Sequence, residues 1–468
     1  AWGNANCLNL NRGPMNEDDM YAKSLVLHNY LFGVELTDTV MLLTEHETVY
    51  FLSSKKKIEF LEQLKGAPGV EDTDLVVKFL TRNKEDSNQE NFDMLLETIE
   101  KDMPVGEKVK VGIFQKEWAA NTEAGTANVS NWQKFLEESE NTELVDVALG
   151  FGLMLAVKED GELDLIKKSS VLGNKILKHG FVPRLEEIID KEEGVSHEAL
   201  AEEVEEIFGD PTKIKLNVPP DHVQSAYFPI VQSGGDYDLR VSALSNQNKM
   251  KFDIITFSLG SRYQSYCSNI ARTFLVDPPK GVSDTYETLI AVYDACLAAM
   301  IPGKPLKSVY AAAVKKLKAE DREDLVECLP KNLGFSIGSY FREGNLTLSQ
   351  KNNVTFKPGM AFNLCVGLSG VKLGKSDKAA ANDKSAVKQL GDYALVIADT
   401  VTITTSSPDV LTKHHKTLTD VSYMLNEEEE ADDDGDGDDD NSNGDATLAR
   451  KIQAQDDNDR NSSRTSKR

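Results

Sequence analysis

One short stretch of the sequence matches a known catalytic pattern, the G-x-S-x-G turn that presents a nucleophilic serine. Residues 334–338 read G-F-S-I-G. Such a serine acts only where the motif joins a strand to a helix and where an acid and a histidine follow along the chain. Here residues 339–343 alternate as a strand does, and the histidines after the motif are His414 and His415. The missing context argues against a serine hydrolase.

Two other sets of residues are weaker candidates for a functional site: a calcium-binding loop and a Cys–His nucleophile pair. Residues 432–437 read D-D-D-G-D-G and imitate the first half of a calcium-binding loop, but the twelfth position is Asn443 rather than glutamate. Cys365 and His222 could form a Cys–His nucleophile only if the fold brought them together with an orienting group. Because Cys365 lies in an apolar run, the sequence favours a buried structural thiol.

The informative passage is residues 252–274, which read F-D-I-I-T-F-S-L-G-S-R-Y-Q-S-Y-C-S-N-I-A-R-T-F. It resembles the paired metal-binding strands of the pita-bread enzymes prolidase, creatinase and methionine aminopeptidase. Three later segments resemble further motifs of these enzymes in the same order: 334–343, 359–367 (G-M-A-F-N-L-C-V-G) and 396–401 (V-I-A-D-T-V). Four motifs in order make a far more specific match than any single one.

The sequence departs from these enzymes at the residues that bind metal. In the enzymes, two aspartates, one histidine and two glutamates hold a pair of divalent cations. The resemblance places other residues at those five positions: Ser258, Asn269, Phe335, Cys365 and Ala398. It also places Val241 where the enzymes have a substrate-contacting histidine. Paired cations need carboxylate and imidazole ligands to activate water. The resemblance therefore implies no catalytic residue, no metal and no cofactor.

The elements that position these residues follow from hydrophobic spacing. Residues 1–157 are predicted to form an α/β lobe, similar to the N-terminal domain of creatinase, with β-rich runs at 39–43, 49–52 and 109–114. Residues 158–425 are predicted to be helical first, over 165–189 with an interruption near Gly180 and Pro183. Later helices are expected after Ser196 and Ser283 as caps and from Pro305. Predicted strands lie at 228–232, 239–244, 252–258, 262–268, 270–275, 334–341, 361–367 and 393–404. The order of these elements predicts the α+β class. The resemblance to the pita-bread enzymes implies that the second lobe has their aminopeptidase-like fold.

Charge and composition narrow the class of protein. The 468 residues carry a formal net charge of −25, which argues against strong direct binding to nucleic acid. The five cysteines are widely spaced without a C-x-x-C pair, and no run approaches a membrane span, so we expect a soluble intracellular protein without membrane attachment. Residues 426–468 hold 15 acids and 6 bases with few apolar side chains, and we expect this tail to be disordered.

Over about residues 15–425 the chain resembles the N-terminal region of the large subunit of FACT, a nuclear histone chaperone, and the acidic run that follows suits a linker of that family. The distinctive stretches are 21–24, 31–39, 53–57, 232–235 and 341–344. The resemblance implies an inactive peptidase-like module that binds histones during nucleosome reorganisation in transcription, replication and repair. It implies location in the nucleus on chromosomes, and an HMG-box companion subunit that binds through further domains.

Three functions stay open at this point. The first is a histone-binding module that holds histone segments in the former substrate cleft and attracts them with an acidic tract. The tract is Glu427, Glu428, Glu429, Glu430, Asp432, Asp433, Asp434, Asp436, Asp438, Asp439 and Asp440. The second is an active metal-dependent aminopeptidase of prolidase type. The third is a platform that binds replication or transcription factors.

Overall fold

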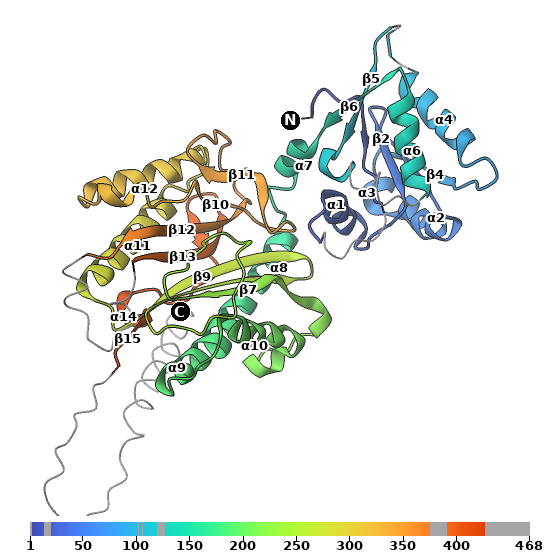
Figure 1. Cartoon of the computed structure of the whole chain (residues 1–468). Coiled ribbons are helices and arrows are strands. Elements are labelled where there is room, and N and C mark those ends of the chain that lie inside the picture. Colours follow the sequence, from blue (N-terminus) through green and yellow to red (C-terminus); the bar gives the residue numbers. More distant parts are fainter. Residues whose placement is uncertain are drawn as a thin grey trace, which may run out of the picture. The chain divides into compact units, whose positions relative to one another are not determined.

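The structure is a computed structural model, and it describes residues 2–13, 20–101, 103–104, 106–118, 127–374 and 391–425. Residues 1–424 form one compact unit that contains two β-sheets, each packed against helices (Figure 1). The predicted α+β class is therefore confirmed. The predicted tail, 426–468, lies outside the described residues. Within the described ranges, no helix has the length and apolar character needed to cross a bilayer.

The first sheet has six strands in the order β4-β3-β2-β1-β5-β6. The strands are β1 (Cys7–Asn9), β2 (Val40–Thr44), β3 (Thr48–Ser53), β4 (Val76–Thr81), β5 (Val109–Ile113) and β6 (Thr142–Asp146). The helices are α1 (Lys23–Phe32), α2 (Lys55–Leu61), α3 (Pro68–Glu71), α4 (Gln89–Glu100), α6 (Ala127–Glu138) and α7 (Ala148–Met154), with a 3₁₀ turn at Glu62–Gly66.

Alternation along the strands of this sheet builds a core on each face. In β2, Leu42 packs into the cluster that contains Trp132 of α6, whereas its neighbour Met41 packs into the cluster that contains Leu27 of α1. Successive side chains of a strand point to opposite faces, so helices cover both sides. The α/β character predicted for this lobe is confirmed, and its helices and sheet form three layers. Sequence reasoning missed β4, α4 and α6.

The second sheet has nine strands, with the path β11-β10-β12-β13-β9-β8-β7; β14 pairs with β13, and β15 pairs with β9. The strands are β7 (Val223–Gln232), β8 (Ile254–Tyr263), β9 (Tyr266–Val276), β10 (Asn332–Ser336), β11 (Glu343–Ser349), β12 (Ala361–Lys372), β13 (Asp392–Ile403), β14 (Pro408–Val410) and β15 (Ser422–Tyr423). The helices are α8 (Asp160–Ile176), α9 (Val182–Asp190), α10 (His197–Gly209), α11 (Lys280–Ala298), α12 (Lys307–Ala319) and α14 (Leu418–Val421). A π turn at Leu177–Phe181 and 3₁₀ turns at Pro211–Ile214, Pro220–His222 and Glu323–Leu325 complete the fold.

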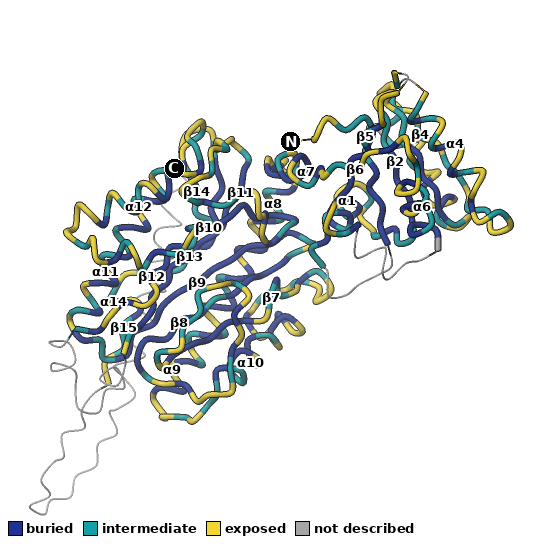
Figure 2. Tube along the Cα trace, turned by 45° about the horizontal axis from the view of Figure 1, so that its top comes forward, coloured by how far each residue is buried: buried dark blue, intermediate teal, exposed yellow. Residues whose placement is uncertain are grey.

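The central strands of this sheet are buried: β9 along its whole length and β13 at every residue after Asp392, as the dark tube in Figure 2 illustrates. One face carries the large apolar side chains and packs against the helices; it includes Phe257 of β8, Phe274 of β9, Leu364 of β12 and Ile397 of β13. The neighbours of these residues in sequence must then point to the opposite face. The side chains of Ser258, Asn269, Cys365 and Ala398, which were singled out in the sequence, lie on that opposite face.

Three element predictions near the site were wrong. Residues 252–268 do not break into two strands near Gly260: β8 runs on to Tyr263, and the hairpin turns at Gln264 and Ser265, both with positive φ. Glycine is needed at 260 because a Cβ there would lie 2.5 Å from the Tyr227 ring, so it marks close packing and not a turn.

The predicted strand at 239–244 is an irregular loop. Within it, Arg240 pairs with the nearby Asp238, and just after it the Ser245 hydroxyl accepts the backbone N–H of Val231 in β7. The strand predicted at 334–341 ends at Ser336, after a register shift beside Gly334, whose φ is +131°. Ser283 lies inside α11, which begins at Lys280, so it is not a cap.

Candidate functional site

The strands bring the singled-out positions together on the face of the second sheet away from the helices. Cys365 of β12 pairs with Ala398 of β13, and Ala398 in turn pairs with Ala271 of β9. Ser258 of β8 is also opposite Ala271, two residues along β9 from Asn269. Phe335 of β10 and Val241 of the loop line one pocket together with Cys365.

The space among Ser258, Asn269 and Cys365 is occupied by the chain itself. The Tyr227 hydroxyl donates to Asn269 Oδ1 at 2.7 Å, and the Asn269 amide donates to Asn363 Oδ1 at 3.1 Å. Leu239 packs here against a small apolar cluster of Ala271, Val396 and Ala398. The remaining cavity has a volume of ≈ 10 Å³, about the minimum that one water molecule needs.

The donor set at this place does not suit a dication. In the described part of the chain, no group of three or more histidine, cysteine, aspartate or glutamate side chains could hold a metal ion. Burial, and then the nearby Asp399 carboxylate, raise the pKa of the Cys365 thiol to about 12. The thiol is therefore protonated at neutral pH, which makes it a poor ligand and a poor nucleophile.

The other nucleophile patterns are not assembled either. His222 lies at the tip of the β8–β9 hairpin, where its ring contacts Tyr263 and its Nδ1 lies 3.3 Å from the Gln264 amide. Cys365 lies within β12, paired with Ala398. Ser336 ends β10 and donates to the carbonyl of Ala361, and no helix follows it. This agrees with the sequence argument against a serine hydrolase.

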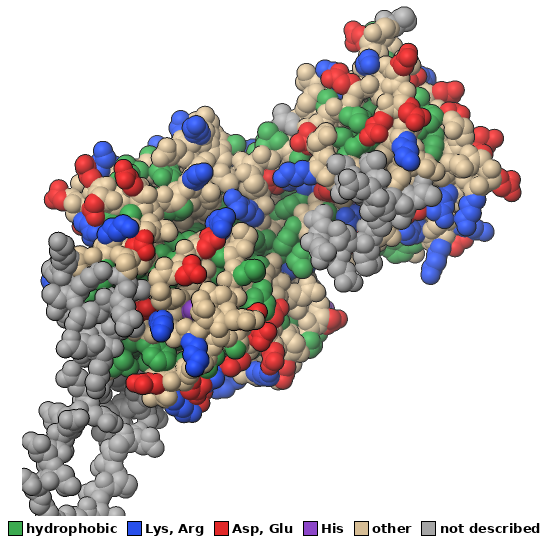
Figure 3. Space-filling view, viewed as in Figure 1, with side chains coloured by type: hydrophobic (Ala, Val, Ile, Leu, Met, Phe, Trp, Pro, Cys, Tyr) green, Lys and Arg blue, Asp and Glu red, His purple; other side chains and the backbone are tan. Residues whose placement is uncertain are grey.

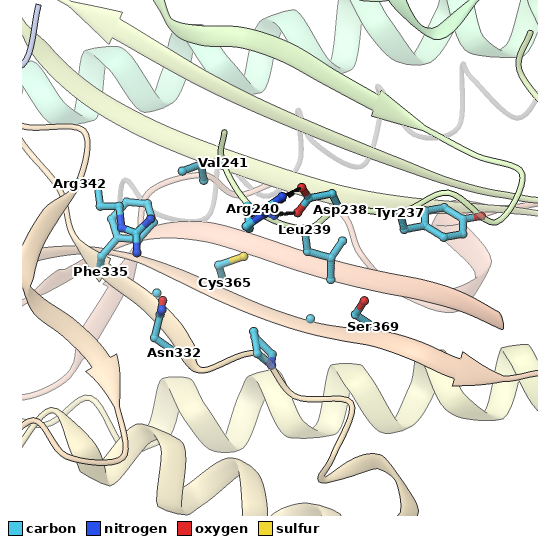
Figure 4. Close-up of a pocket in the computed structure, with 13 residues that line it drawn as sticks. Tyr237, Asp238, Leu239, Arg240, Val241, Asn332, Phe335, Arg342, Cys365 and Ser369 are labelled. Atoms are coloured by element: carbon cyan, nitrogen blue, oxygen red, sulfur yellow. Dashed lines mark hydrogen bonds and ion pairs between the residues drawn. The ribbon is translucent and has the colours of Figure 1, made fainter. Parts of the chain in front are cut away.

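Next to the space among Ser258, Asn269 and Cys365, which we call the filled region, a pocket of ≈ 270 Å³ remains open. Figure 4 shows the loop that contains Leu239 on one side and Cys365 of β12 on the other. The lining residues are Tyr237, Asp238, Leu239, Arg240, Val241, Pro330, Asn332, Gly334, Phe335, Arg342, Cys365, Gly367 and Ser369. The arginines were not singled out in the sequence, because the residues that gather around them come from separate segments.

The charged side chains of this pocket have distinct environments. The Arg240 guanidinium donates two bonds to the Asp238 carboxylate, at 2.9 and 2.5 Å. The Arg240 side chain holds the pKa of Asp238 below its usual value. The guanidinium carbon of Arg342 lies 5.5 Å from the centre of the Phe335 ring, within the range of a cation–π contact.

A buried carboxyl anchors the loop that covers the pocket. Asp253 accepts the backbone N–H groups of Gly234 and Ile254. Burial raises the pKa of Asp253 to about 7 despite these bonds. The Tyr237 hydroxyl donates to the carbonyl of Ile254, so both ends of the turn are tied to the start of β8. These bonds hold the loop that lines the pocket in a fixed position relative to β8.

An acidic surface lies over α9 and α10, and it was not singled out in the sequence. Residues 182–210 contain 11 carboxylates against two basic side chains. Figure 3 shows acidic side chains, with Lys and Arg between them, at this end of the second sheet. Those classed as exposed are Glu186, Glu187, Asp190, Glu192, Glu202, Glu203, Glu206 and Asp210. The acidic tract over 427–440 lies outside the described residues.

Comparisons with known proteins cover nearly all of the folded region. Residues 1–150 match the model described as the FACT complex subunit SPT16 N-terminal lobe domain, and residues 164–405 match the metallopeptidase family M24 model. FACT complex subunit SPT16 of Dictyostelium discoideum is 36% identical over 435 residues, which are 92% of this chain and 38% of that protein. The Arabidopsis thaliana protein of the same name is 34% identical over 92% of this chain and 39% of its own length. The chain thus spans about two fifths of the curated relatives it matches.

Solved structures that resemble this chain belong to the same two groups of proteins. The N-terminal domain of FACT complex subunit SPT16 from Cicer arietinum matches with a TM-score of 0.79 and 33% identity, over 90% of this chain and 94% of that one. An X-Pro aminopeptidase from Thermotoga maritima matches with a TM-score of 0.57 and 14% identity, over 90% and 98% of the two chains. At that identity the second likeness shows the fold alone.

Proposed function

The chain belongs to the SPT16 family of FACT complex subunits, and on that basis we propose that it is a histone-binding module with a peptidase fold and no hydrolytic activity. Its work is then nucleosome reorganisation in transcription, DNA replication and DNA repair, on chromosomes in the nucleus. An HMG-box companion subunit would bind to parts of the protein beyond this chain, and replication or transcription factors are further partners.

The observation that carries the loss of hydrolysis is the chemistry of the filled region. We take Ser258, Asn269, Phe335, Cys365 and Ala398 to stand where the pita-bread enzymes have their ligands, and Val241 where they have a substrate histidine. A hydroxyl, an amide, a phenyl ring, a protonated thiol and a methyl group cannot replace carboxylates and imidazole. The bond from Tyr227 to Asn269 also satisfies the amide that would face a cation.

We expect the chain to leave Xaa-Pro dipeptides intact in the presence of Mn²⁺, Co²⁺ or Zn²⁺. The reason is that the described side chains around the pocket offer no pair of carboxylates to hold two cations. Release of proline is the measurement, with and without a chelator. Turnover that stops on adding the chelator would contradict the proposal and restore the alternative of an active aminopeptidase.

Attraction to histones is best explained by carboxylates outside the pocket. The acidic surface over α9 and α10 and the acidic tract over 427–440 both carry an excess of negative charge. Such surfaces compete with DNA phosphate for lysine-rich proteins, and the contact weakens with salt. The pocket does not fit this role: of its lining residues, Asp238 alone carries a carboxylate, and that group is paired with Arg240. We therefore place histone contacts outside the former cleft, contrary to the sequence-based expectation.

We expect neutralising either acidic region to weaken histone binding and to flatten its dependence on salt. One variant changes every acid of 427–440 to its amide, and a second carries Asp190→Asn, Glu192→Gln and Glu202→Gln on α9 and α10. The first variant should lose about tenfold or more in affinity at 0.1 M salt. Each carboxylate of the tract contributes a weak, salt-screened attraction to basic histone side chains, and the variant removes all of them. The measurement is titration of purified core histones onto the chain at several salt concentrations.

The matched control for this experiment removes acids from the first sheet's helices. Glu85→Gln, Glu90→Gln and Glu97→Gln change the same number of charges as the α9–α10 variant, at exposed positions on or beside α4. The control should bind histones like the unmodified chain. Equal binding by all four proteins would remove acidic attraction from the proposed function.

A further inference from the structure

The pocket beside the filled region has a charge opposite to that expected of a groove for basic peptides. Its lining holds two arginines and one aspartate. Arg240 donates to both carboxylate oxygens of Asp238, so that pair is close to neutral. The remaining full charge in the lining is the guanidinium of Arg342.

Arg342 is placed to receive an anion. It is exposed, and among the described residues its guanidinium contacts the Phe335 ring and forms no ion pair. Phe335, which is 4% exposed, supports the group from below through its ring. Figure 4 shows the two side chains lying together at one end of the pocket. A supported guanidinium offers a planar fork of donors that matches a carboxylate in two parallel bonds.

The rest of the pocket is suited to an apolar group next to that anion. Leu239, Val241, Phe335 and Pro330 contribute apolar walls, and the Cys365 thiol between them is protonated. The volume of ≈ 270 Å³ is close to the lower limit of about 300 Å³ for small-ligand sites. It suits one large side chain rather than a long ligand.

We propose that this pocket binds a peptide segment in which a carboxylate lies beside a large apolar side chain, with Arg342 holding the carboxylate. The carboxylate can come from an acidic side chain or from the C-terminus of the peptide. The site goes beyond the proposed histone binding, since it selects the opposite charge and uses different residues. It assigns the region of the former substrate cleft to an acidic partner.

The test uses short peptides and the methyl groups of Leu239 and Val241 as NMR reporters in the whole chain. The probes are acetyl-Gly-Phe-Glu-Gly-amide, its Gln and Lys analogues, and acetyl-Gly-Gly-Phe with a free or an amidated C-terminus. The Glu peptide should bind at least about tenfold more tightly than the Gln peptide, because a bidentate charged bond is lost in the latter. The free and amidated Phe peptides show whether a C-terminal carboxylate serves as well as a side chain.

Variants of the arginine show whether it is the group responsible. Arg342→Gln should abolish the preference for the Glu peptide, and Arg342→Lys should retain only part of it, because an ammonium lacks the fork. Arg322→Gln is the control: that arginine pairs with Asp324 and lines a separate hollow. Equal binding of the Glu and Gln peptides, tighter binding of the Lys peptide, or an unchanged preference in Arg342→Gln would overturn the proposal. Binding of the Glu peptide by a chain that fails to bind histones would overturn the proposed function alone.

Discussion

Asp399→Asn is expected to destabilise the second sheet by about 3–5 kcal/mol, the range seen when one partner of a buried ion pair is removed. Asp399 and Arg272 are both fully buried, and an Arg272 nitrogen lies 2.8 Å from Asp399 Oδ1. The carboxylate also accepts the hydroxyls of Tyr293, at 2.7 Å, and Thr412, at 2.8 Å. The substitution leaves the arginine without a counter-charge in a site that water does not reach.

The effect should extend along the sheet because Arg272 joins several segments. Its guanidinium donates to the carbonyls of Ala271 and Ala398, which belong to neighbouring strands, and to the carbonyl of His414 beyond β14. Without the counter-ion, the buried charge is compensated only by hydrogen bonds to backbone carbonyls, which include that of His415 at 3.3 Å. We therefore expect the whole sheet to unfold at a lower urea concentration, and not a change confined to the site.

Urea denaturation of the variant and the unmodified chain measures the effect. Asp409→Asn is the matched control, because Asp409 forms a partly exposed pair with Lys413 at 3.5 Å and should cost at most about 1 kcal/mol. The double variant Arg272→Met with Asp399→Leu should be more stable than Asp399→Asn, since no charge is left unpaired. A change below about 1 kcal/mol in Asp399→Asn would contradict this expectation, because it would mean that water reaches the Arg272 guanidinium and screens its charge.

Much of the second sheet could be predicted because its strands alternate between the two faces. Phe257 and Ser258 are neighbours in sequence, and their opposite directions follow from the strand period alone. The quoted motifs also contain Arg272 and Asp399, which form a buried ion pair that supports the sheet. The same short segments therefore contain both residues that hold the sheet together and the positions that the resemblance singles out.

The pocket could not be predicted, for reasons that lie in the loop residues. Residues 239–244 alternate in polarity as a strand does, yet Asp238 and Arg240 bond to each other and turn the chain. That turn places Leu239 against Ala271 and Ala398, and no pattern in the local sequence predicts this contact. Arg342 gains its role from Phe335, and their contact depends on where β10 ends and β11 begins.

Ala398→Glu is expected to destabilise the chain by about 3 kcal/mol or more at neutral pH, because it buries a carboxylate with no partner. Ala398 is 0% exposed and packs with Ala271 and Val396. Ala398→Gln is the control, since it adds a similar volume without the charge. The difference between the two variants isolates the cost of the negative charge.

The pH dependence of that difference has a definite sign. Burial raises the folded-state pKa of the new Glu above its unfolded value of about 4.3, so the folded state holds the proton to a higher pH. The folded form then loses stability relative to the Gln variant as pH rises from about 4.3 to that raised pKa, and the difference stays constant above it. Below about pH 4 the two variants should have similar unfolding free energies.

Divalent cations turn this variant into a test of the filled region. If the surrounding residues could still bind a cation, the new glutamate would serve as a ligand. Mn²⁺ would then restore stability by binding the folded state. We expect no restoration, because Ser258, Asn269 and Cys365 supply no carboxylate beside the new one and Tyr227 already occupies the Asn269 amide. Stabilisation of Ala398→Glu, but not of Ala398→Gln, by micromolar Mn²⁺ would show that the region still assembles around a cation. In that case the loss of hydrolysis would have to be explained by Leu239 and the loop above it, and not by the ligands.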